Sequence, residues 1–230
     1  MSNLTKKQKI IQEKHDPEKT YTLEEAMDII QSVKSEKFDE SIDISVKLGV
    51  DPDKSDQNVR GAVTLPNSLG KEVKVAVFAD GDHASDAEAA GAEYVGMDDL
   101  AEKFQKDEVN VDVVISTNSA MKVVGKLGQV LGPKGLMPNP KTGTVSDDVV
   151  TAIKNVKAGQ VRFRTDKNGI IHGSIGKVSF EENKIKANAS ALLEELRKLK
   201  PASAKGVYIG NIALSSTMGP GVKINPGELV

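Results

Sequence analysis

At 230 residues the chain can form one large domain or two of ordinary size, and its 38% of hydrophobic residues is sufficient for packed cores. The absence of Cys excludes disulfides and thiolate metal sites. The lack of a secretory signal, and of any apolar run near the roughly 20 residues of a membrane span, favours a soluble, intracellular protein. The formal net charge of −2 argues against general electrostatic adhesion to nucleic acid.

The N-terminal part of the sequence predicts one helix followed by two strands. Residues 23–33 carry apolar side chains at helical spacing, with Thr22 as N-cap and Glu25 at the capping-box position. Residues 41–50 alternate apolar and polar side chains with a period of two, which predicts a half-buried antiparallel strand. Residues 59–65 repeat that pattern after a segment of turn-forming residues.

The middle of the chain has a different pattern. Residues 73–79 and 109–115 are mostly continuous apolar runs, typical of strands buried on both faces. Helical stretches alternate with them at residues 84–90, 97–104 and 120–131. Ser146 is predicted to cap a further helix, with Asp147 and Asp148 in its first turn. Strands that alternate with helices indicate a parallel α/β layer of about 90 residues.

Alternation of apolar and polar residues returns after Gln160. Residues 161–164 and 169–177 predict two further strands. Residues 189–199 predict a helix with leucines on one face, and residues 207–215 predict a last, imperfect strand around a glycine. The C-terminal part therefore resembles the N-terminal part rather than the middle.

A domain insertion explains this arrangement most simply, because the pattern of antiparallel strands lies at both ends and that of parallel strands lies between them. We predict a discontinuous α+β domain, an antiparallel sheet with helices, built from residues 1–66 and 160–230. An α/β domain of residues 67–159 is predicted to interrupt it. Two connections would then join the domains and permit a hinge.

The sequence shows no arrangement typical of catalysis or metal binding. His15, His83 and His172 are far apart and lack metal-ligand spacing. The glycines of residues 125–135 form neither a dinucleotide-binding fingerprint nor a phosphate-binding loop. We therefore expect no enzyme, no cofactor and no metal.

The charge is distributed unevenly along the chain. Residues 160–230 hold 11 basic and 6 acidic side chains, a net charge of +5. Residues 1–66 hold 10 and 13, a net charge of −3, and residues 67–159 hold 10 and 14, a net charge of −4. The basic excess is confined to the C-terminal third, although charge alone is equally compatible with ordinary surface scatter.

A loop rich in glycine and proline stands out in the middle of the chain. Residues 128–143 contain four Gly and three Pro, which predicts an ordered loop. They lie within residues 113–146, a stretch with four Lys and no acidic residue. A long loop in a compact domain is usually functional or disordered, and the alternative interpretation here is a stiff connector.

Two further segments carry residues suited to RNA. In residues 215–221, hydroxyl groups and glycine N–H groups suit phosphate and 2′-OH contacts, and Met218 can pack on a base or sugar. The alternative is a C-terminal turn with a buried Met. Residues 37–41 open the first strand, where Phe38 can stack on a base, although a buried Phe at a strand entry is more common.

Together these segments resemble the signatures of the bacterial ribosomal protein L-one family. The matching stretches are Lys37-Phe38-Asp39-Glu40-Ser41, residues 48–61, residues 131–141 with their Gly-Pro-Lys-Gly-Leu-Met-Pro core, and Ser216-Thr217-Met218-Gly219-Pro220. The resemblance covers essentially the whole chain. It implies a discontinuous first domain that binds large-subunit ribosomal RNA at the mobile stalk, near the tRNA exit site. It also implies that the inserted α/β domain is Rossmann-like, with three layers.

The resemblance further implies a function and its partners. Members of this family help to release deacylated tRNA from the exit site, and they repress translation of their own operon by binding an mRNA site that mimics the ribosomal one. The expected partners are therefore large-subunit ribosomal RNA, exit-site tRNA and the mRNA of its own operon. We expect a cytoplasmic protein of the ribosome that has no membrane partner and is a monomer when free.

The resemblance also implies which residues contact RNA. Carried over by motif, these are Lys37, Phe38, Glu40, Ser41, Ser216, Thr217, Met218, Gly219 and Pro220. A stretch similar to the family's basic strand pair adds Lys167, Gly169 and His172. Ser41 stands where the family pattern has Thr, which keeps the hydroxyl and loses a methyl. The acidic net charge departs from the ribosomal norm and favours a site specific in shape and hydrogen bonding.

Two other interpretations remain open from the residues alone. One is an α/β enzyme that uses a nucleotide or a sugar phosphate, with the inserted domain holding the cofactor. The other is a protein scaffold in which the glycine-proline loop docks a protein partner. Turnover or nucleotide binding would favour the first, and partner binding that survives RNase treatment would favour the second.

Overall fold

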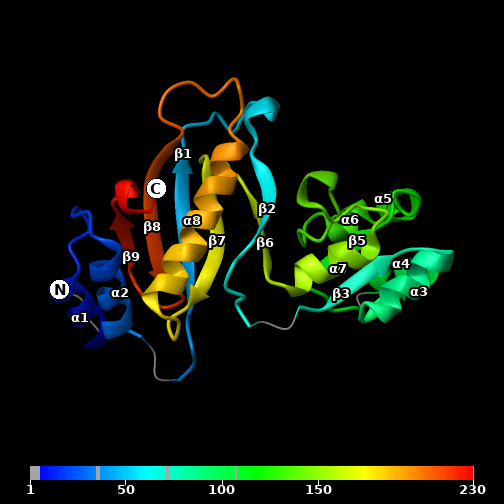
Figure 1. Ribbon diagram of the computed structural model, residues 1–230, viewed down its shortest axis with the longest axis horizontal. Helices are drawn as coiled ribbons and strands as arrows, with labels where there is room; N and C mark the ends of the chain where they lie inside the picture. Colours follow the sequence, from blue (N-terminus) through cyan, green and yellow to red (C-terminus); the bar gives the residue numbers. More distant parts are fainter. Residues whose placement is uncertain (1–5, 35–36, 71–72, 107, 230) are drawn as a thin grey trace. The chain divides into compact units, whose positions relative to one another are not determined.

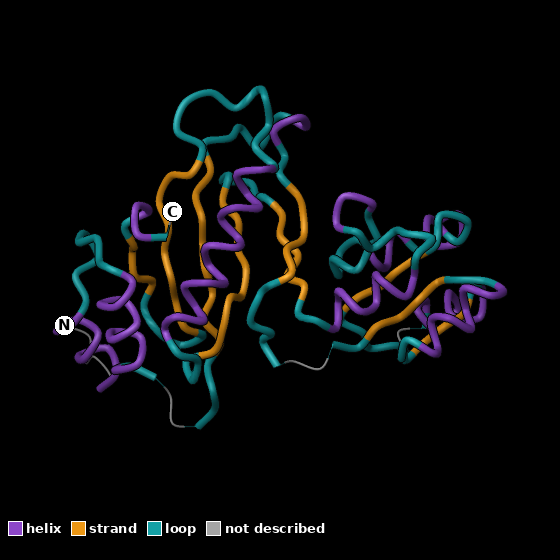
Figure 2. Tube along the Cα trace, viewed as in Figure 1, coloured by secondary structure: helices purple, strands orange, loops and turns teal. Residues whose placement is uncertain are grey.

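The computed structural model describes residues 6–34, 37–70, 73–106 and 108–229 (Figures 1 and 2). The chain divides into two compact units, Met1–Leu69 with Val161–Val230, and Gly70–Gln160. The first unit contains an antiparallel sheet and the second a parallel sheet, so the protein is of mixed α and β type, as predicted.

The first unit is built around a four-stranded sheet in the order β7-β1-β8-β9 (Figure 1). Its strands are β1 (Ser41–Leu48), β7 (Ile170–Lys177), β8 (Ile209–Ser216) and β9 (Gly221–Ile224). β1 pairs antiparallel with both β7 and β8, so the N-terminal strand lies between two C-terminal strands. The sequence did not predict β9, because four residues are too few to establish a period of two.

Two helices of the first unit cover one face of this sheet. The unit has α1 (Lys6–Lys14), α2 (Leu23–Ser32) and α8 (Glu182–Lys198), together with a two-stranded sheet of β2 (Arg60–Thr64) and β6 (Gln160–Arg164). α8 crosses in front of the sheet in Figure 1. Alternate residues of β1, among them Ile42 and Ile44, are buried in one core with Ile30 of α2 and Leu192 of α8. Short 3-10 turns lie at Ser55–Gln57 and Pro226–Glu228.

The helix boundaries of the first unit confirm one prediction and correct another. At α2, Thr22 Oγ1 accepts the N–H of Glu25 (3.2 Å), and Glu25 Oε2 accepts the N–H of Thr22 (3.1 Å), which is the predicted capping box. α8 begins at Glu182 rather than at residue 189. The first half of α8 is mostly polar, so its sequence lacks the apolar periodicity that predicts a helix. Ile185 and Asn188 are nevertheless fully buried there.

The second unit is a parallel sheet in the order β4-β3-β5, with helices on both faces. Its strands are β3 (Val75–Phe78), β4 (Tyr94–Gly96) and β5 (Val113–Ser116), and its helices are α3 (Gly81–Ala89), α4 (Asp98–Gln105), α5 (Met121–Lys126), α6 (Gly128–Leu131) and α7 (Val149–Lys157), with a 3-10 turn at Pro140–Thr142. One core joins Phe78 to α4, α5 and α6, and another joins Val77 to α3 and α7. All four residues of β3 and of β5 are buried, which explains their continuous apolar sequences.

Two local predictions in the second unit were wrong. The single helix predicted for residues 120–131 is two short helices that meet at Leu127, beside two glycines that weaken helix propagation. The helix predicted to begin after Ser146 begins at Val149, and its N-cap is Asp148, whose carboxylate accepts the N–H of Thr151 (3.1 Å). Ser146 instead accepts the N–H of Asp148 (3.1 Å) in the preceding turn.

Candidate nucleic-acid interface

One face of the four-stranded sheet in the first unit is left open by its core helices. Its side chains, which we call the open face, include Ser41, Asp43, Ser45 and Lys47 of β1, His172, Ser174 and Lys177 of β7, Ala213 and Ser215 of β8, and Lys223 of β9. They are half-buried or exposed and alternate with the buried residues that meet α2 and α8. In register, Asp43 lies between Ser174 and Ser215. The serines are small hydroxyl side chains that let a polynucleotide approach the sheet closely, and the lysines can contact phosphates.

The segment before β1 and the turn after β8 are hydrogen-bonded at one end of this face. The N–H of Ser41 donates to Thr217 Oγ1 (3.1 Å), and the N–H of Thr217 donates to the carbonyl oxygen of Ser41 (3.1 Å). The N–H of Met218 donates to Glu40 Oε2 (3.2 Å). Glu40 is only 1% exposed. Its carboxylate therefore stabilises the turn from within the fold and does not present its charge to solvent.

Two large apolar side chains are exposed at this end. Phe38 is 49% and Met218 is 60% exposed, so neither takes the buried role that the sequence left open. Glu40 fixes the backbone of Met218, and Phe38 lies two residues before Glu40. The turn after β8 therefore carries one exposed apolar side chain at an end of the open face, and the segment that enters β1 carries another.

The turn after β8 depends on a glycine. The N–H of Gly219 donates to the carbonyl oxygen of Ser216 (3.1 Å), and a Cβ added to Gly219 would lie 2.4 Å from Ser216 Oγ. Ser216 is 4% exposed, and within the described residues its hydroxyl has no hydrogen-bond partner. The sequence proposed an RNA contact through the Ser216 hydroxyl. The structure buries that group and leaves Gly219 and Pro220 half-buried at the surface.

The other predicted residues lie on β7 and on the turn before it. Gly169 has a φ of +74° and is buried, and its carbonyl oxygen accepts the N–H of Leu48 (2.8 Å). Gly169 therefore determines the conformation of the turn and is not part of an exposed surface. Lys167 is exposed in the same turn. His172 pairs in register with Ser45 on the open face.

The structure therefore brings together some of the predicted residues and separates others. Lys37–Ser41 and Ser216–Pro220 meet at the start of β1, whereas Gly169 meets its end at Leu48. These two ends are about 23 Å apart, at roughly 3.3 Å per residue. His172 lies between them, opposite Ser45. A binding site that used every predicted residue would extend along the whole strand.

Sequence reasoning missed the polar residues between these two ends. Ser45, Ser174 and Asp166 were not predicted, although alternation along β1 already placed Ser45 on the polar side. His172 Nε2 lies 3.3 Å from Asp166 Oδ2, and His172 Nδ1 lies 3.2 Å from Ser45 Oγ. These contacts depend on the register between β1 and β7, which a single sequence does not specify.

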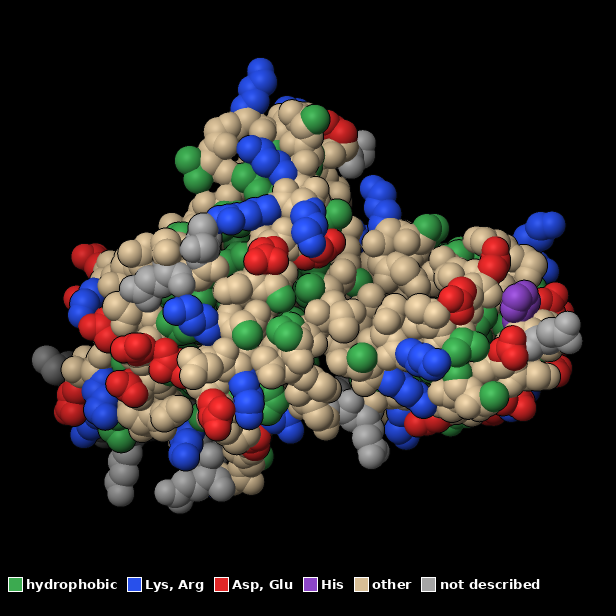
Figure 3. Space-filling model, viewed as in Figure 1, with side chains coloured by type: hydrophobic (Ala, Val, Ile, Leu, Met, Phe, Trp, Pro, Cys, Tyr) green, Lys and Arg blue, Asp and Glu red, His purple; other side chains and the backbone are tan. Residues whose placement is uncertain are grey.

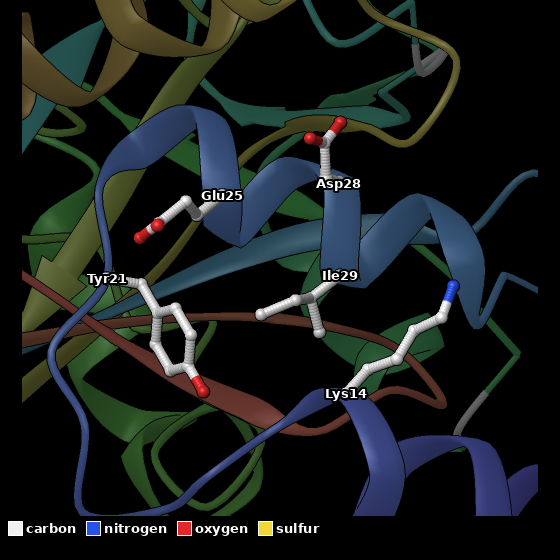
Figure 4. A pocket seen from close by; sticks show the side chains of 5 residues that line it. All are labelled: Lys14, Tyr21, Glu25, Asp28 and Ile29. Carbon is white, nitrogen blue, oxygen red and sulfur yellow. The ribbon is translucent and has the colours of Figure 1, made fainter.

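A hollow of about 310 Å³ lies elsewhere in the first unit, lined by residues of α1, α2 and the segment between them (Figure 4). Its lining residues are Lys14, Tyr21, Glu25, Asp28 and Ile29. The Tyr21 hydroxyl is already used, since it accepts the N–H of Asp16 (2.7 Å). Two carboxylates against one ammonium disfavour a phosphate ligand here.

The two sides of the first unit differ in their charged side chains. On the helix-covered side, drawn in Figure 3, basic and acidic side chains lie side by side. On the open face, Lys47, Lys177 and Lys223 are basic and Asp43 is acidic, beside four serines and one imidazole. This arrangement suits hydrogen bonds from the serines together with phosphate contacts by the lysines.

The glycine-proline loop of the second unit is ordered by its own hydrogen bonds. The carbonyl oxygen of Asn139 accepts from the hydroxyls of Thr142 (2.9 Å) and Thr144 (3.2 Å). Thr144 Oγ1 in turn accepts the N–H of Asn139 (2.8 Å). Leu136 and Met137 pack against a core of the unit. The described residues contain no group of three or more His, Cys, Asp or Glu that could hold a metal ion.

Comparison with known proteins identifies the family. The model of the ribosomal protein L1p/L10e family matches residues 30–220. The large ribosomal subunit protein uL1 of Saccharophagus degradans is 57% identical over 229 residues, which cover 100% of this chain and 99% of that relative. The proteins of the same name from Methylococcus capsulatus and Pseudoalteromonas atlantica are 58% and 57% identical over 229 residues, with 100% of this chain and 99% and 98% of those relatives covered.

The chain belongs to the ribosomal protein L1p/L10e family, whose bacterial members are structural, non-enzymatic proteins of the large ribosomal subunit. This confirms the resemblance seen in the sequence and excludes the enzyme alternative. It also places the chain in the cytoplasm with the ribosome. Separately, none of the helices in the described residues is long and apolar enough to cross a membrane.

Proposed function

We propose that the first unit binds a folded element of large-subunit ribosomal RNA, at the mobile stalk near the tRNA exit site, through the open face and the turn after β8. The observation that carries this proposal is the pair of exposed side chains, Phe38 and Met218, on the two segments that meet at one end of the open face, where the buried carboxylate of Glu40 accepts the N–H of Met218. Exposed aromatic and apolar groups at such a place suit stacking on unpaired bases or sugars. The second unit is a Rossmann-like three-layer domain inserted into this RNA-binding domain.

The predicted residues divide into contacting and positioning groups in this proposal. Phe38 and Met218 contact bases or sugars, and Lys37 and Lys167 contact phosphates. The contacts of Ser41, Thr217 and His172 are hydrogen bonds from the open face and its edge. Glu40, Ser216 and Gly169 act by position, because all three are buried. Gly219 and Pro220 set the shape of the turn, which lets the backbone approach the RNA closely.

Family membership supports two further proposed activities. We infer that the protein assists the release of deacylated tRNA from the exit site, and that it represses its own operon by binding an mRNA site that mimics the ribosomal one. A shared site requires ribosomal RNA and mRNA to compete for the same protein, which we expect to be a monomer when free. A competition assay with both RNAs tests this directly: simultaneous binding of both RNAs would contradict a shared site.

Affinity for stalk RNA, measured across a salt series with an unrelated transcript beside it, tests the main proposal. About three to five phosphate contacts predict a shallow dependence on salt. Loss of the exposed side chains in the variant Phe38→Ala/Met218→Ala should reduce affinity by about 2 kcal/mol or more, as removal of stacking groups does. Thr217→Ala should cost about 1 kcal/mol.

A matched control is available in the same unit. Val207 is a large apolar side chain that is 77% exposed, near the opposite end of β8 from Met218. Val207→Ala should leave RNA affinity unchanged. Equal affinity of the wild-type protein for stalk RNA and the unrelated transcript, or equal losses in Val207→Ala and Phe38→Ala/Met218→Ala, would remove the proposed site.

A further inference from the structure

Three side chains on and beside the open face form one hydrogen-bonded chain. His172 of β7 lies between Asp166, which precedes β7, and Ser45 of β1. Its Nε2 lies 3.3 Å from Asp166 Oδ2, and its Nδ1 lies 3.2 Å from Ser45 Oγ. His172 and Ser45 are neighbours in the register of the two strands, so the backbone itself fixes their approach.

Asp166 is the fixed end of this chain. The N–H groups of Asn168 and Ile170 both donate to its Oδ1 at 2.8 Å, which leaves Oδ2 for His172. The bond from Ile170 is the main reason that the pKa of Asp166 lies below its ordinary value, so the group is a carboxylate at neutral pH. A carboxylate only accepts hydrogen bonds, so Nε2 of His172 must carry a hydrogen.

The position of that hydrogen decides what Ser45 can offer to a ligand. A neutral imidazole has one N–H, so when Nε2–H donates to Asp166, Nδ1 accepts the hydroxyl hydrogen of Ser45. The Ser45 oxygen then presents only lone pairs to the outside. When His172 takes up a proton, Nδ1–H donates to Ser45, and the hydroxyl hydrogen is free to donate outward.

We propose that Asp166 is a positioning residue that fixes the hydrogen on His172, and that His172 thereby sets the hydrogen-bond polarity of Ser45 toward RNA. With neutral His172, Ser45 accepts from a ribose 2′-OH, and with protonated His172 it donates to a phosphate oxygen. This inference rests on the proposed function, because it takes the open face to be the surface on which the RNA lies.

Other charged groups near His172 do not replace Asp166 in this role. The charged side chains on the surrounding elements are Asp43 and Lys47 of β1, Lys167 of the turn, Lys177 of β7, and Arg162 and Arg164 of β6. Lys47 Nζ donates to the carbonyl oxygen of Asn168 (3.0 Å). Asp43 pairs with Ser174 and Ser215, and it lies two residues along β1 from Ser45, which is the partner of His172. Among the described acidic residues, Asp166 is the one hydrogen-bonded to the imidazole.

The position of the hydrogen can be measured on the full-length protein without RNA. Nitrogen-15 NMR of the His172 ring at about pH 8, above the range where histidine ordinarily takes up a proton, should show the Nε2–H form. Asp166→Ala should shift the ring to a mixture of both forms, whereas Ser45→Ala should keep Nε2–H. A wild-type ring in the Nδ1–H form, or a ring unchanged in Asp166→Ala, would overturn the assignment.

The effect on RNA is measured as affinity for stalk RNA at two pH values at which the same NMR experiment shows the His172 ring to be neutral and protonated. Affinity of the wild-type protein should rise about tenfold, which corresponds to roughly 1.4 kcal/mol, as one charge-assisted hydrogen bond provides. Ser45→Ala should rise only about threefold, because the added positive charge remains and the hydroxyl is lost. His172→Gln cannot take up a proton, so its affinity should not rise with acid.

Ser215→Ala is the matched control, since it removes a hydroxyl of the open face that is not bonded to His172. It should keep the tenfold rise of the wild-type protein. An equal rise in Ser45→Ala and wild type would overturn the role of Ser45. If the wild-type protein binds no stalk RNA at any pH, the proposed function fails and the RNA part of this inference fails with it, while the NMR result still decides the role of Asp166.

Discussion

The two sheets of this protein differ in how they are covered. The three-stranded sheet of the second unit has helices on both faces, and each residue of β3 and β5 is buried, whereas β4 at its edge is half-buried. The four-stranded sheet of the first unit is covered by helices on one face and leaves hydroxyl and charged side chains on the other. A sheet buried on both faces has nothing to offer a large ligand, whereas a half-covered sheet presents a flat, polar surface. The predicted RNA-contact residues accordingly lie on and around the second kind of sheet.

The largest expected change in the free energy of unfolding comes from comparing one side chain of each sheet. Phe78 of β3 is fully buried, so Phe78→Ala should reduce the free energy of unfolding by about 3–5 kcal/mol. Ser174→Ala on the open face should change it by less than about 0.5 kcal/mol, as surface substitutions do. Urea unfolding monitored by circular dichroism measures both. A large loss in Ser174→Ala would mean that the face is not open.

A buried polar group tests the covered face of the first sheet. Asn188 of α8 is 0% exposed, donates to the carbonyl oxygens of Ile175 (2.7 Å) and Asn67 (3.0 Å), and accepts the N–H of Asn67 (3.0 Å). Asn188→Ala leaves these backbone groups without partners, which should cost about 2–3 kcal/mol. Asn183→Ala, at an exposed position of the same helix, is the control and should be nearly neutral. Similar losses in the two variants would show that the hydrogen bonds of Asn188 are not what stabilises this region.

The turn at the edge of the open face should respond to a single methyl group. A Cβ at Gly219 would lie 2.4 Å from Ser216 Oγ, so Gly219→Ala should cost about 1–2 kcal/mol of unfolding free energy through crowding. Ser216→Ala removes a buried hydroxyl that has no partner among the described residues, and it should be neutral or slightly stabilising. The double variant Ser216→Ala/Gly219→Ala should recover most of the loss. A double variant no more stable than Gly219→Ala would place the cause elsewhere, such as in the backbone.

Much of the fold was predictable because burial leaves a periodic trace in the sequence. The period of two in β1 and the continuous apolar runs of β3 and β5 correspond to one and two covered faces. The capping box at Thr22 was equally readable, since it depends on residues three apart. The helix cap at Asp148 was not, because Ser146, Asp147 and Asp148 are all residue types that cap helices, and the hydrogen bonds of Asp147 with Asn118 are tertiary contacts that the local sequence does not show.

The candidate site was predictable only as separate segments. The motifs named the residues before β1 and after β8, but not that Glu40 would be buried and Met218 exposed. Those facts depend on hydrogen bonds between residues 178 positions apart in the sequence. The chain of Asp166, His172 and Ser45 had no sequence signal at all, because it arises from the register of β7 on β1.

The smallest expected loss of stability comes from a contact between two helices that cover the sheet of the second unit. Lys157, at the end of α7, donates through Nζ to the carbonyl oxygens of Gly91 (2.7 Å) and Ala90 (3.3 Å), just beyond the end of α3. An ammonium at the C-terminus of a helix is worth about 0.3–1 kcal/mol and is screened by salt, so Lys157→Met should lose about that much at low ionic strength. The loss should shrink at about 1 M salt, where the Debye length is about 3 Å. A loss that does not depend on salt would mean that Lys157 stabilises this face through the packing of its aliphatic chain, and that hydrophobic contact alone covers the sheet there.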